Sequence, residues 1–594
     1  MPNALLVYPE FPASYWSFKF ALEFLGKRSA MPPLGLLTVA GMFPERYDLR
    51  VVDLNVATLT DADLDWADLV FTSSMLVQKD SLYEVVARAR RAGTPVVAGG
   101  PHPTTYHETI REDTDNGVAH YLLGETEETF AGFLRDLESG CARQYYQEPR
   151  KPSIALTPLP RYDLIDLDRY SSLALQFSRG CPYNCEFCDI TKLFGRVPRT
   201  KSPEQLLGEF DLLYRLGWRG PLFLVDDNFI GNRKDAMQVL PEVARWQEEH
   251  DHPFSLYTEA SMNLASHPAL LDAMQAAGFN LVFVGIESPN QAALVTTKKK
   301  QNTSRHEDSE RFLLNAVRTI QGHGIEVTAG FIIGLDGDTE FDSHIRFIQE
   351  AGIPMAMAGL LTVIRNTDLH HRLTREGRMR ADSTGNNTDI TLNFDPELPE
   401  AFLLGEYRRV LATLYQPSLR NYFDRCLTLL DHLRPTVHSV RPVTGNDVRP
   451  LVMSLTRQLF SRQGPAYARF LWRVVRHHRR MFPEAVRLAI MGYHFEKVTR
   501  QTIATYNFRE FLQAELERAR RRIAAMAEGW NPDPEAIGRY VSRVLARAEG
   551  RYQRLHADFR DSVAEALVGF REGVREEFRA LAEGHGPSPS GQGA

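Results

Sequence analysis

Short apolar runs alternate with helix-compatible stretches along the N-terminal part of the chain. The apolar runs occupy residues 4–8, 49–54, 68–73, 95–99 and 119–123. Strands that alternate with helices form parallel sheets whose two faces are both covered by helices. The pattern therefore predicts an α/β fold that begins with a doubly wound, Rossmann-like domain over residues 1–150.

Polar residues and glycines follow these predicted strands. Parallel α/β sheets bind ligands at the carboxyl ends of their strands, so these residues predict one ligand-binding edge. They are Asp53, Asn55, Ser73, Ser74, Gly99, Gly100, His102, Gly124 and Glu125.

A second alternation covers residues 151–395. Strand candidates lie at 173–178, 221–226, 254–258, 281–286, 327–333 and 357–363, and helical stretches such as 203–216 and 309–323 lie between them. Six such units joined by right-handed crossovers predict a partial (β/α)6 barrel, related to the TIM barrel, with its active site at the carboxyl-terminal mouth.

After about residue 395 the strand signal fades and the sequence becomes rich in arginine and helical in pattern. Helical stretches such as 403–415, 485–497 and 509–528 predict a helical C-terminal domain over residues 396–583. Residues 584–594 are mostly Gly, Pro and Ser, which predicts a disordered tail. Three domains and a tail agree with a length of 594 residues.

Composition narrows the choice of partners and compartment. The chain is 43% hydrophobic and 24% charged with a formal net charge of −6, which gives no electrostatic reason to expect nucleic acid. No apolar run approaches the roughly 20 residues of a membrane span, and no charged segment with a cleavage site precedes the first strand. Five cysteines, three of them within eight positions, do not form a disulfide framework. We therefore expect a cytoplasmic protein with a metal-binding thiol cluster.

The clustered cysteines are Cys181, Cys185 and Cys188, with CxxxCxxC spacing. Four thiolates normally saturate a four-iron cluster, so three closely spaced ligands leave one iron open to bind a further molecule. A zinc site is the alternative, but it needs a fourth Cys or His and usually CxxC pairs. The spacing favours a 4Fe-4S cluster.

The segment SRGCPYNCEFCDI, residues 178–190, closely resembles the signature loop of the radical S-adenosylmethionine (radical SAM) superfamily. The resemblance implies that the open iron binds S-adenosylmethionine and that an electron from the cluster cleaves its sulfonium bond to give a 5'-deoxyadenosyl radical. Phe187 matches the aromatic position of that loop, which implies packing near the cluster and adenine; a plain hydrophobic contact is the alternative.

Later segments are similar to further motifs of the cobalamin-linked branch of this superfamily. They are LVDDNFIGN with Asp226 and Asp227, YTEAS with Glu259 and Ser261, VGIES with Glu287, and GFIIGL with Ile332 and Gly334. The resemblance implies that these residues contact S-adenosylmethionine. Each motif alone is weak, because an acidic residue at a strand end is as often a helix cap as a ligand.

The N-terminal motifs PPLGLLTVAGM, with Pro33 and Gly35, VVDLNV, VAGGPHPT and LLGETEET resemble the cobalamin-binding domain of radical SAM methylases. Glycines after parallel strands let the backbone approach a large flat ligand. A generic doubly wound domain is the alternative. No Asp-x-His-x-x-Gly is present to supply an axial imidazole to cobalt, and the lone His102 is either a hydrogen-bonded loop residue or a cobalt contact.

The opening segment LLVYPEFPASYWSFKFALEFLGK resembles a branch of the superfamily that includes the hopanoid methylases. The resemblance implies a cobalamin-dependent methyltransferase acting on an unactivated carbon of a lipid or other small molecule, with an electron donor such as flavodoxin or ferredoxin. Ring formation or carbon–carbon coupling without methyl transfer is an alternative, and a cobalamin-binding sensor is a remote one. A methylthiolating tRNA enzyme is disfavoured, because no second cysteine set precedes Cys141.

The sequence does not determine the contacts that two segments make. Where the family has a Pro-Gly-Thr-like turn after the sixth strand, this chain has IRNTDLHHRL from Ile364. The segment 469–482, RFLWRVVRHHRRMF, resembles a basic amphipathic surface helix, which predicts either peripheral contact with anionic lipid or a solvated face over an ordinary core stripe.

Overall fold

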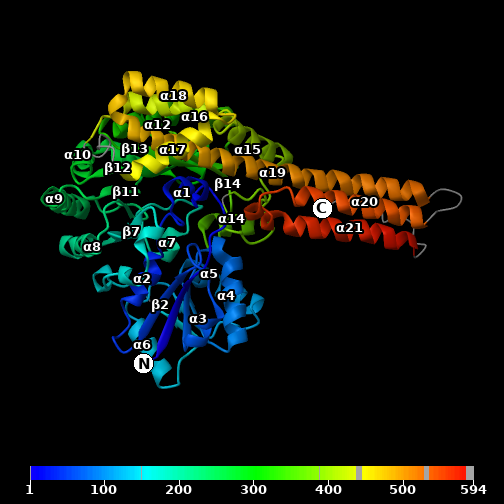
Figure 1. Ribbon diagram of the computed structural model, residues 1–594, viewed down its shortest axis with the longest axis horizontal. Helices are drawn as coiled ribbons and strands as arrows, with labels where there is room; N and C mark the ends of the chain where they lie inside the picture. The colour runs from blue at the N-terminus through cyan, green and yellow to red at the C-terminus, as the bar shows by residue number, and fades with distance from the viewer. Residues whose placement is uncertain (1, 149, 387, 437–444, 528–533, 583–594) are drawn as a thin grey trace. The chain divides into compact units, whose positions relative to one another are not determined.

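The computed structural model describes residues 2–148, 150–386, 388–436, 445–527 and 534–582 (Figure 1). The chain forms two compact units, Met1–Glu496 and Lys497–Ala594. The sequence-based boundaries at residues 150 and 395 both fall inside the first unit and stay predictions. The tail expected at 584–594 lies outside the described residues.

The first sheet is entirely parallel, with strand order β2-β1-β3-β4-β5-β6. Five of its strands lie within a residue or two of the apolar runs of the sequence, and the sixth, β6, was not expected. The strands are β1 Asn3–Tyr8, β2 Asp48–Asp53, β3 Leu69–Ser73, β4 Val96–Gly99, β5 His120–Leu123 and β6 Tyr145–Gln147.

Helices cover both faces of this sheet. Leu5 and Val7 of β1 pack on one side, against α3 Asp61–Trp66, α4 Lys79–Ala92 and α5 Pro101–Asp113. Ala4 and Leu6, the alternate residues, pack on the other side, against α2 Leu34–Ala40 and α6 Phe130–Glu138. The doubly wound architecture predicted from the sequence is confirmed.

The second sheet is the partial barrel. Its order β14-β13-β12-β11-β10-β7 follows the sequence, and every pair is parallel. The strands are β7 Leu173–Leu175, β10 Pro221–Leu224, β11 Ser255–Glu259, β12 Phe279–Glu287, β13 Glu326–Ile333 and β14 Ala356–Leu360. The helices between them include α8 Pro203–Arg215, α9 Arg233–Glu249, α10 Pro268–Ala276, α12 Ser309–Gly322 and α13 Phe341–Glu350.

The first barrel strand is shorter than the sequence indicates. β7 ends at Leu175, and the chain then forms β8 Ser178–Arg179, which pairs antiparallel with β9 Arg199–Thr200. This short ladder closes the base of the loop that carries the three cysteines, so the loop begins and ends at fixed points beside the barrel.

After the barrel and α14, Asp368–Arg375, the described part of the first unit continues with helices α15 Glu400–Leu414, α16 Arg420–His432, α17 Gly445–Leu459 and α18 Gly464–His477. The 46-residue α19, Phe482–Ala527, merges two stretches that the sequence pattern separates, and it begins in the first unit. The amphipathic segment 469–482 is divided, because α18 ends at His477 and α19 starts at Phe482.

In the second unit, α19 continues and is joined by α20 Pro534–Tyr552 and α21 Ala564–Ala582. Phe508, Leu512, Val544 and Val574 lie in a shared apolar core of these helices. Among the described helices of both units, none combines the length and the apolar character needed to cross a bilayer.

Candidate active site at the barrel mouth

Two aspartates anchor the start of the cysteine loop. Both oxygens of Asp226 accept backbone N–H groups, from Phe177 at 3.2 Å and from Ser178. Oδ2 of Asp227 accepts the N–H of Gly180 at 2.9 Å. Burial raises the pKa of Asp226 to about 7 and that of Asp227 to about 6. The second-strand motif therefore fixes the backbone immediately before Cys181.

Side-chain amides donate toward two of the cysteine sulfurs. Nδ2 of Asn228 lies 3.9 Å from Sγ of Cys181, and Nε2 of Gln301 lies 3.4 Å from Sγ of Cys185. Such donors favour the thiolate, which is the form that binds iron. Neither amide was singled out from the sequence.

A buried ion pair lies beside the same loop. Nζ of Lys299 is 2.7 Å from Oε1 of Glu287 and 5.8 Å from the ring centroid of Phe187. Burial acts to lower the pKa of Lys299, but the charges of Glu287 and of the nearby cysteines outweigh it and hold that pKa above its usual value. Glu287 adopts φ +65°, where a residue other than glycine is strained.

The carboxylate of Glu259 lies at the end of β11 among other acids. Burial, with the charges of Asp227, Asp226 and Glu287, raises the pKa of Glu259 to about 8. Next along the chain, Oγ of Ser261 donates to Asn263 at 2.6 Å and lies 3.2 Å from Nδ2 of Asn228. A cluster of carboxylates whose pKa values are raised is suited to bind a cationic ligand.

The last motif lies on and after β13. Ile332 is half-buried on the strand, and Gly334 follows it with φ +101°. A Cβ at Gly334 would lie 3.0 Å from a methyl group of Leu403 in α15, so a larger residue would meet both backbone strain and this neighbour.

The segment that departs from the family pattern forms α14, Asp368–Arg375, and holds the cysteine loop from outside. Arg372 donates to Glu186 at 2.8 Å and to Asp336 at 2.8 Å. Asp368 accepts from Asn184 at 3.1 Å, and the N–H of Leu369 donates to the carbonyl of Glu186 at 2.8 Å. The segment IRNTDLHHRL therefore forms a helix that contacts the cysteine loop, where the family has a turn. We call these contacts, made by Asp368, Leu369 and Arg372, the clamp on the cysteine loop.

The ligand edge of the first sheet contains the residues expected there. Asp53 is buried, accepts from the side chain of Asn55 at 2.6 Å and from Tyr170 Oη at 2.9 Å, and has its pKa raised by burial. Pro33 directly precedes α2, and Gly35 is exposed in the first turn of that helix.

Ser73, Gly99 and Gly100 meet at the ends of β3 and β4. Gly100 has φ +92°, and a Cβ there would lie 2.6 Å from Oγ of Ser73. At Gly124, with φ +80°, a Cβ would meet nothing within 4 Å. Gly100 thus packs closely against the end of β3, whereas open space lies beside the backbone at Gly124, where a large flat ligand could approach.

His102 lies in α5 and not in a loop. Its side chain is buried, Nδ1 lies 3.4 Å from Oγ of Ser74, and the rings of Tyr106 and Tyr83 lie 5.7 and 6.5 Å away. Burial lowers the pKa of His102 to about 4, so the imidazole is neutral. These contacts explain His102 as a buried residue of the domain core.

Glu125 connects the two sheets. It accepts from Arg179 at 2.9 Å and from both terminal nitrogens of Arg199 at 2.8 Å, while Glu127 also pairs with Arg179. Arg179 and Arg199 are the paired residues of the β8–β9 ladder. Glu125, which follows a strand of the first sheet, therefore binds the base of the cysteine loop through these ion pairs.

Family models match both parts of this arrangement. Residues 28–134 match the B12 binding domain, and residues 175–348 match the Radical SAM superfamily. Residues 367–507 match a domain of unknown function, DUF4070. An uncharacterized methyltransferase of Synechocystis is 40% identical over 559 residues, covering 92% of this chain and 100% of that protein. The chain belongs to the cobalamin-binding radical SAM superfamily.

Two further comparisons agree with this assignment. The hopanoid C-2 methylase of Rhodopseudomonas palustris is 35% identical, covering 70% of this chain and 77% of that protein. The structure of the cobalamin-dependent S-adenosylmethionine radical enzyme OxsB matches with a TM-score of 0.54 at 14% identity, over 84% of each chain, which shows a shared fold. The protein is thus a radical SAM enzyme of the methyltransferase group.

The side chains present fit the cofactors of this superfamily: a 4Fe-4S cluster, S-adenosylmethionine and cobalamin. Three half-buried thiols with amide donors suit the cluster, the acids around Glu259 suit the cationic S-adenosylmethionine, and the open space beside Gly35 and Gly124 suits cobalamin. Within the described ranges, no three His, Cys, Asp or Glu side chains are arranged to hold a single metal ion. The individual role of each site residue stays a prediction.

Proposed function

We propose that the protein transfers a methyl group to an unactivated carbon of a lipid or similarly apolar small molecule. The observation that carries this proposal is the inner face of the barrel. Residues of interior parallel strands are normally buried on both faces, yet here one face of each central strand stays partly exposed. The partly exposed residues of the central strands include Phe223, Tyr257, Phe283, Gly285, Gly330 and Ile332, and Gly359 of the edge strand β14 is also partly exposed.

The inner face combines aromatic side chains with glycines, which leave space because they have no side chain. Phe223 and Tyr257 stack with centroids 4.7 Å apart at 5°, and Phe283 lies beside the Cβ position of Gly330. Trp16, from the segment after β1, packs against Phe283 at 4.8 Å and is itself 39% exposed. Aromatic walls with glycine-lined space accommodate a broad apolar molecule and give it contact area.

The chain's own residues then have distinct tasks. When bound, the cofactors supply a carbon radical and a transferable methyl group. We propose that Cys181, Cys185 and Cys188 hold the cluster, that Asp226 and Asp227 fix the loop that carries them, and that Glu259 and Ser261 bind S-adenosylmethionine. The aromatic inner face orients the substrate and excludes water from the reacting carbon.

Methyl transfer is favoured over ring formation by the similar proteins. The two sequence relatives are named a methyltransferase and a methylase, and both align with most of their length. We extend that outcome to this chain, with an electron donor such as flavodoxin or ferredoxin as redox partner and the cytoplasm as compartment.

Mass spectrometry tests the reaction. Lipid and soluble extracts of a strain lacking the gene are compared with those of its parent and of a strain carrying the Cys181→Ala, Cys185→Ala, Cys188→Ala variant. We expect loss of species heavier by one methylene, with accumulation of the lighter precursors, in both mutant strains. Precursors that differ by two hydrogens would instead establish ring formation or coupling, and unchanged extracts with intact protein levels would refute the proposal.

The same variant separates the enzyme from a sensor. Purified anaerobically, it is expected to form no 5'-deoxyadenosine while the wild-type protein does. Formation by a correctly folded variant would contradict the role of the three cysteines.

A further inference from the structure

The surface around α18 is basic and apolar at once. Between Phe460 and Pro483 the sequence has six arginines and no acidic residue. α18 packs against α16 and α17 with buried residues such as Tyr467, Phe470 and Val474, and turns its other face outward. We call this outer face, with Arg462 before the helix and the arginines that follow it, the α18 surface; it comprises Arg462, Arg469, Trp472, Arg473, Val475, Arg476, Arg479 and Arg480.

The arginines of the α18 surface have no acidic partner among the described residues. Elsewhere in the first unit, arginines of these helices are paired, for example Arg457 with Glu23 and Arg487 with Glu326. The next acid along the chain, Glu484, already binds Arg487. A run of uncompensated guanidinium groups on one face creates a local positive field in a chain whose net charge is −6.

Large apolar side chains are exposed among these charges. Trp472 is 63% exposed and Val475 is 56% exposed, while Phe460, just before the surface, is 90% exposed. Arg469, Trp472 and Arg476 recur every three or four positions, so they share one side of the helix. An aromatic residue flanked by arginines on one helix face is the composition of a helix that lies in a membrane interface.

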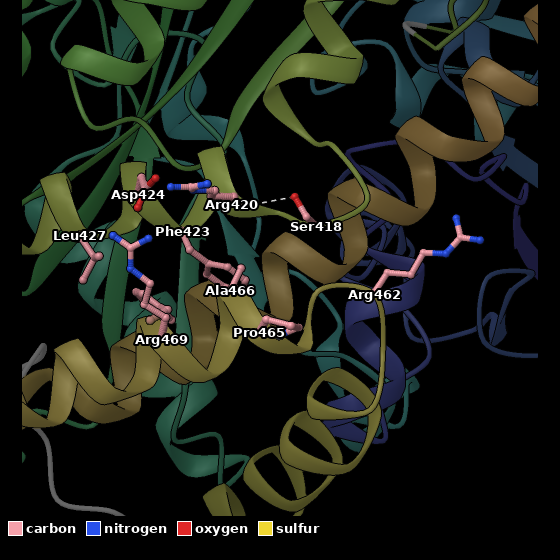
Figure 2. A pocket seen from close by; sticks show the side chains of 10 residues that line it. Ser418, Arg420, Phe423, Asp424, Leu427, Arg462, Pro465, Ala466 and Arg469 are labelled. Atoms are coloured by element: carbon pink, nitrogen blue, oxygen red, sulfur yellow. Dashed lines mark hydrogen bonds between the residues drawn. The ribbon is translucent and has the colours of Figure 1, made fainter.

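A pocket beside α18 extends this surface. It lies between α16 and α18, has a volume of about 430 Å³ and is lined by Arg420, Arg462 and Arg469 together with Asp424. Phe423 and Phe470 stack in its wall at 4.9 Å and 21°. Figure 2 shows the guanidinium groups of Arg420 and Arg469 on the same side of the pocket, with Arg462 on the other. Its size and charge suit the phosphate-bearing headgroup of a lipid.

We propose that the α18 surface docks the protein on a membrane containing anionic phospholipid. Trp472 and Val475 enter the interface, the arginines contact lipid phosphates, and the adjoining pocket receives a headgroup. Charge complementarity selects this occupant, since anionic lipid both neutralises the arginines and buries the apolar side chains. The proposal assigns a role to part of the DUF4070 region and does not depend on the methylation chemistry.

Vesicle sedimentation with the full-length, cluster-loaded protein tests this. Vesicles of phosphatidylcholine alone are compared with vesicles that also contain phosphatidylglycerol. We expect binding to the mixed vesicles only, and weaker binding as salt shortens the Debye length below about 10 Å. Each arginine near an anionic surface strengthens binding about fivefold, so Arg469→Glu with Arg476→Glu should weaken it by at least about 25-fold.

Matched variants separate the effect of the α18 surface from a general effect of charge or of misfolding. Arg215→Glu with Arg245→Glu makes the same charge change on the barrel helices α8 and α9, and should retain most of the binding. Trp472→Ala should weaken binding without altering its salt dependence. Far-UV circular dichroism and thermal unfolding verify that each variant is folded.

Three results would overturn the proposal. The first is a wild-type protein that does not bind mixed vesicles. The second is a variant with Arg469→Glu and Arg476→Glu that binds them as strongly as the wild type. The third is a variant with Arg215→Glu and Arg245→Glu that loses as much binding as the α18 variant. Binding of the α18 surface to duplex DNA, without binding to vesicles, would assign the surface to nucleic acid instead.

Discussion

Lys299 donates a 2.7 Å hydrogen bond to Glu287, and this buried ion pair lies beside the loop of cluster-binding cysteines. The pair puts a fixed positive charge near Cys185 and Cys188, whose charges in turn raise the pKa of Lys299. A cation near an iron–sulfur cluster stabilises the reduced, more negative state of the cluster. Lys299 is therefore placed to help set the reduction potential.

Replacing Lys299 with Met should make the cluster's midpoint potential more negative by several tens of millivolts, since each 59 mV corresponds to about tenfold in a one-electron equilibrium. The loss of the cation also leaves Glu287 unpaired, which acts in the same direction. Redox titration followed by electron paramagnetic resonance measures the shift. Lys298→Met is the control, because Lys298 is exposed and pairs with Asp368 at 3.5 Å. An unchanged potential in a Lys299→Met protein with full iron content would contradict this role.

The clamp on the cysteine loop should govern how firmly the cluster is retained. Arg372→Met removes the arginine partner of the nearly buried Glu186, while Asp336 loses one of its two arginine partners and keeps Arg378 at 2.9 Å. An uncompensated buried charge at Glu186 is costly, so we expect the loop to loosen while the barrel stays folded. Iron release to a chelator should become several-fold faster at unchanged secondary structure. Arg346→Met, which breaks an exposed pair with Glu310, serves as the comparison and should release iron at the wild-type rate.

Much of this architecture could be predicted from the sequence because its strands are apolar, short and regularly spaced. All five strands expected in the first sheet and all six in the barrel are present, in sheets of the expected kind. The extra strand β6, YYQ, is only three residues long and was too short to be recognised. The long helix α19 was divided, because its apolar positions do not follow one continuous stripe.

The cysteines, Asp226, Asp227, Glu259, Ser261 and Glu287 were found through motifs, but their partners were not. Lys299 and Gln301 come from the polar segment TTKKKQN, in which three consecutive lysines look alike. Only the fold shows that Lys299 is buried while Lys298 is exposed. Arg372 likewise belongs to a segment that departs from the family pattern, so no motif could mark it.

The raised pKa of Glu259 predicts a pH-dependent affinity for S-adenosylmethionine. Below pH of about 8 the free enzyme holds this carboxyl protonated, and binding a cation must then expel the proton. Affinity should fall by up to tenfold per pH unit below about 8 and level off above it. Calorimetry at several pH values measures this trend. The α-amino group of the ligand also titrates near pH 8 and contributes its own pH dependence. The Glu259→Gln variant is the control that shows this contribution alone. The variant should bind more weakly at high pH and show a shallower dependence; the same slope in both proteins would remove Glu259 from the binding step.

Arg425 joins α16 to the end of the barrel, and its loss should destabilise the first unit. The side chain is 1% exposed, and it donates to the carbonyls of Ile353 and Leu414 at 3.1 Å and of Pro354 at 3.3 Å. The rings of Tyr415 and Tyr422 lie 5.3 and 5.4 Å from its guanidinium carbon. Arg425→Met removes a buried donor from each of these carbonyls, of which Pro354 keeps the Tyr415 hydroxyl at 3.3 Å, so the free energy of unfolding should fall by about 3–5 kcal/mol.

Denaturant unfolding followed by circular dichroism measures this loss, with Arg420→Met on the same helix as the control. Arg420 faces an open pocket and has no ion pair in the described part of the chain, so its replacement should change stability by at most about 0.5 kcal/mol. Equal stabilities of the two variants would show that the donated hydrogen bonds of Arg425 are matched by water in the variant. A large loss confined to Arg425→Met would establish that the helices after the barrel stabilise the strand edge at β14.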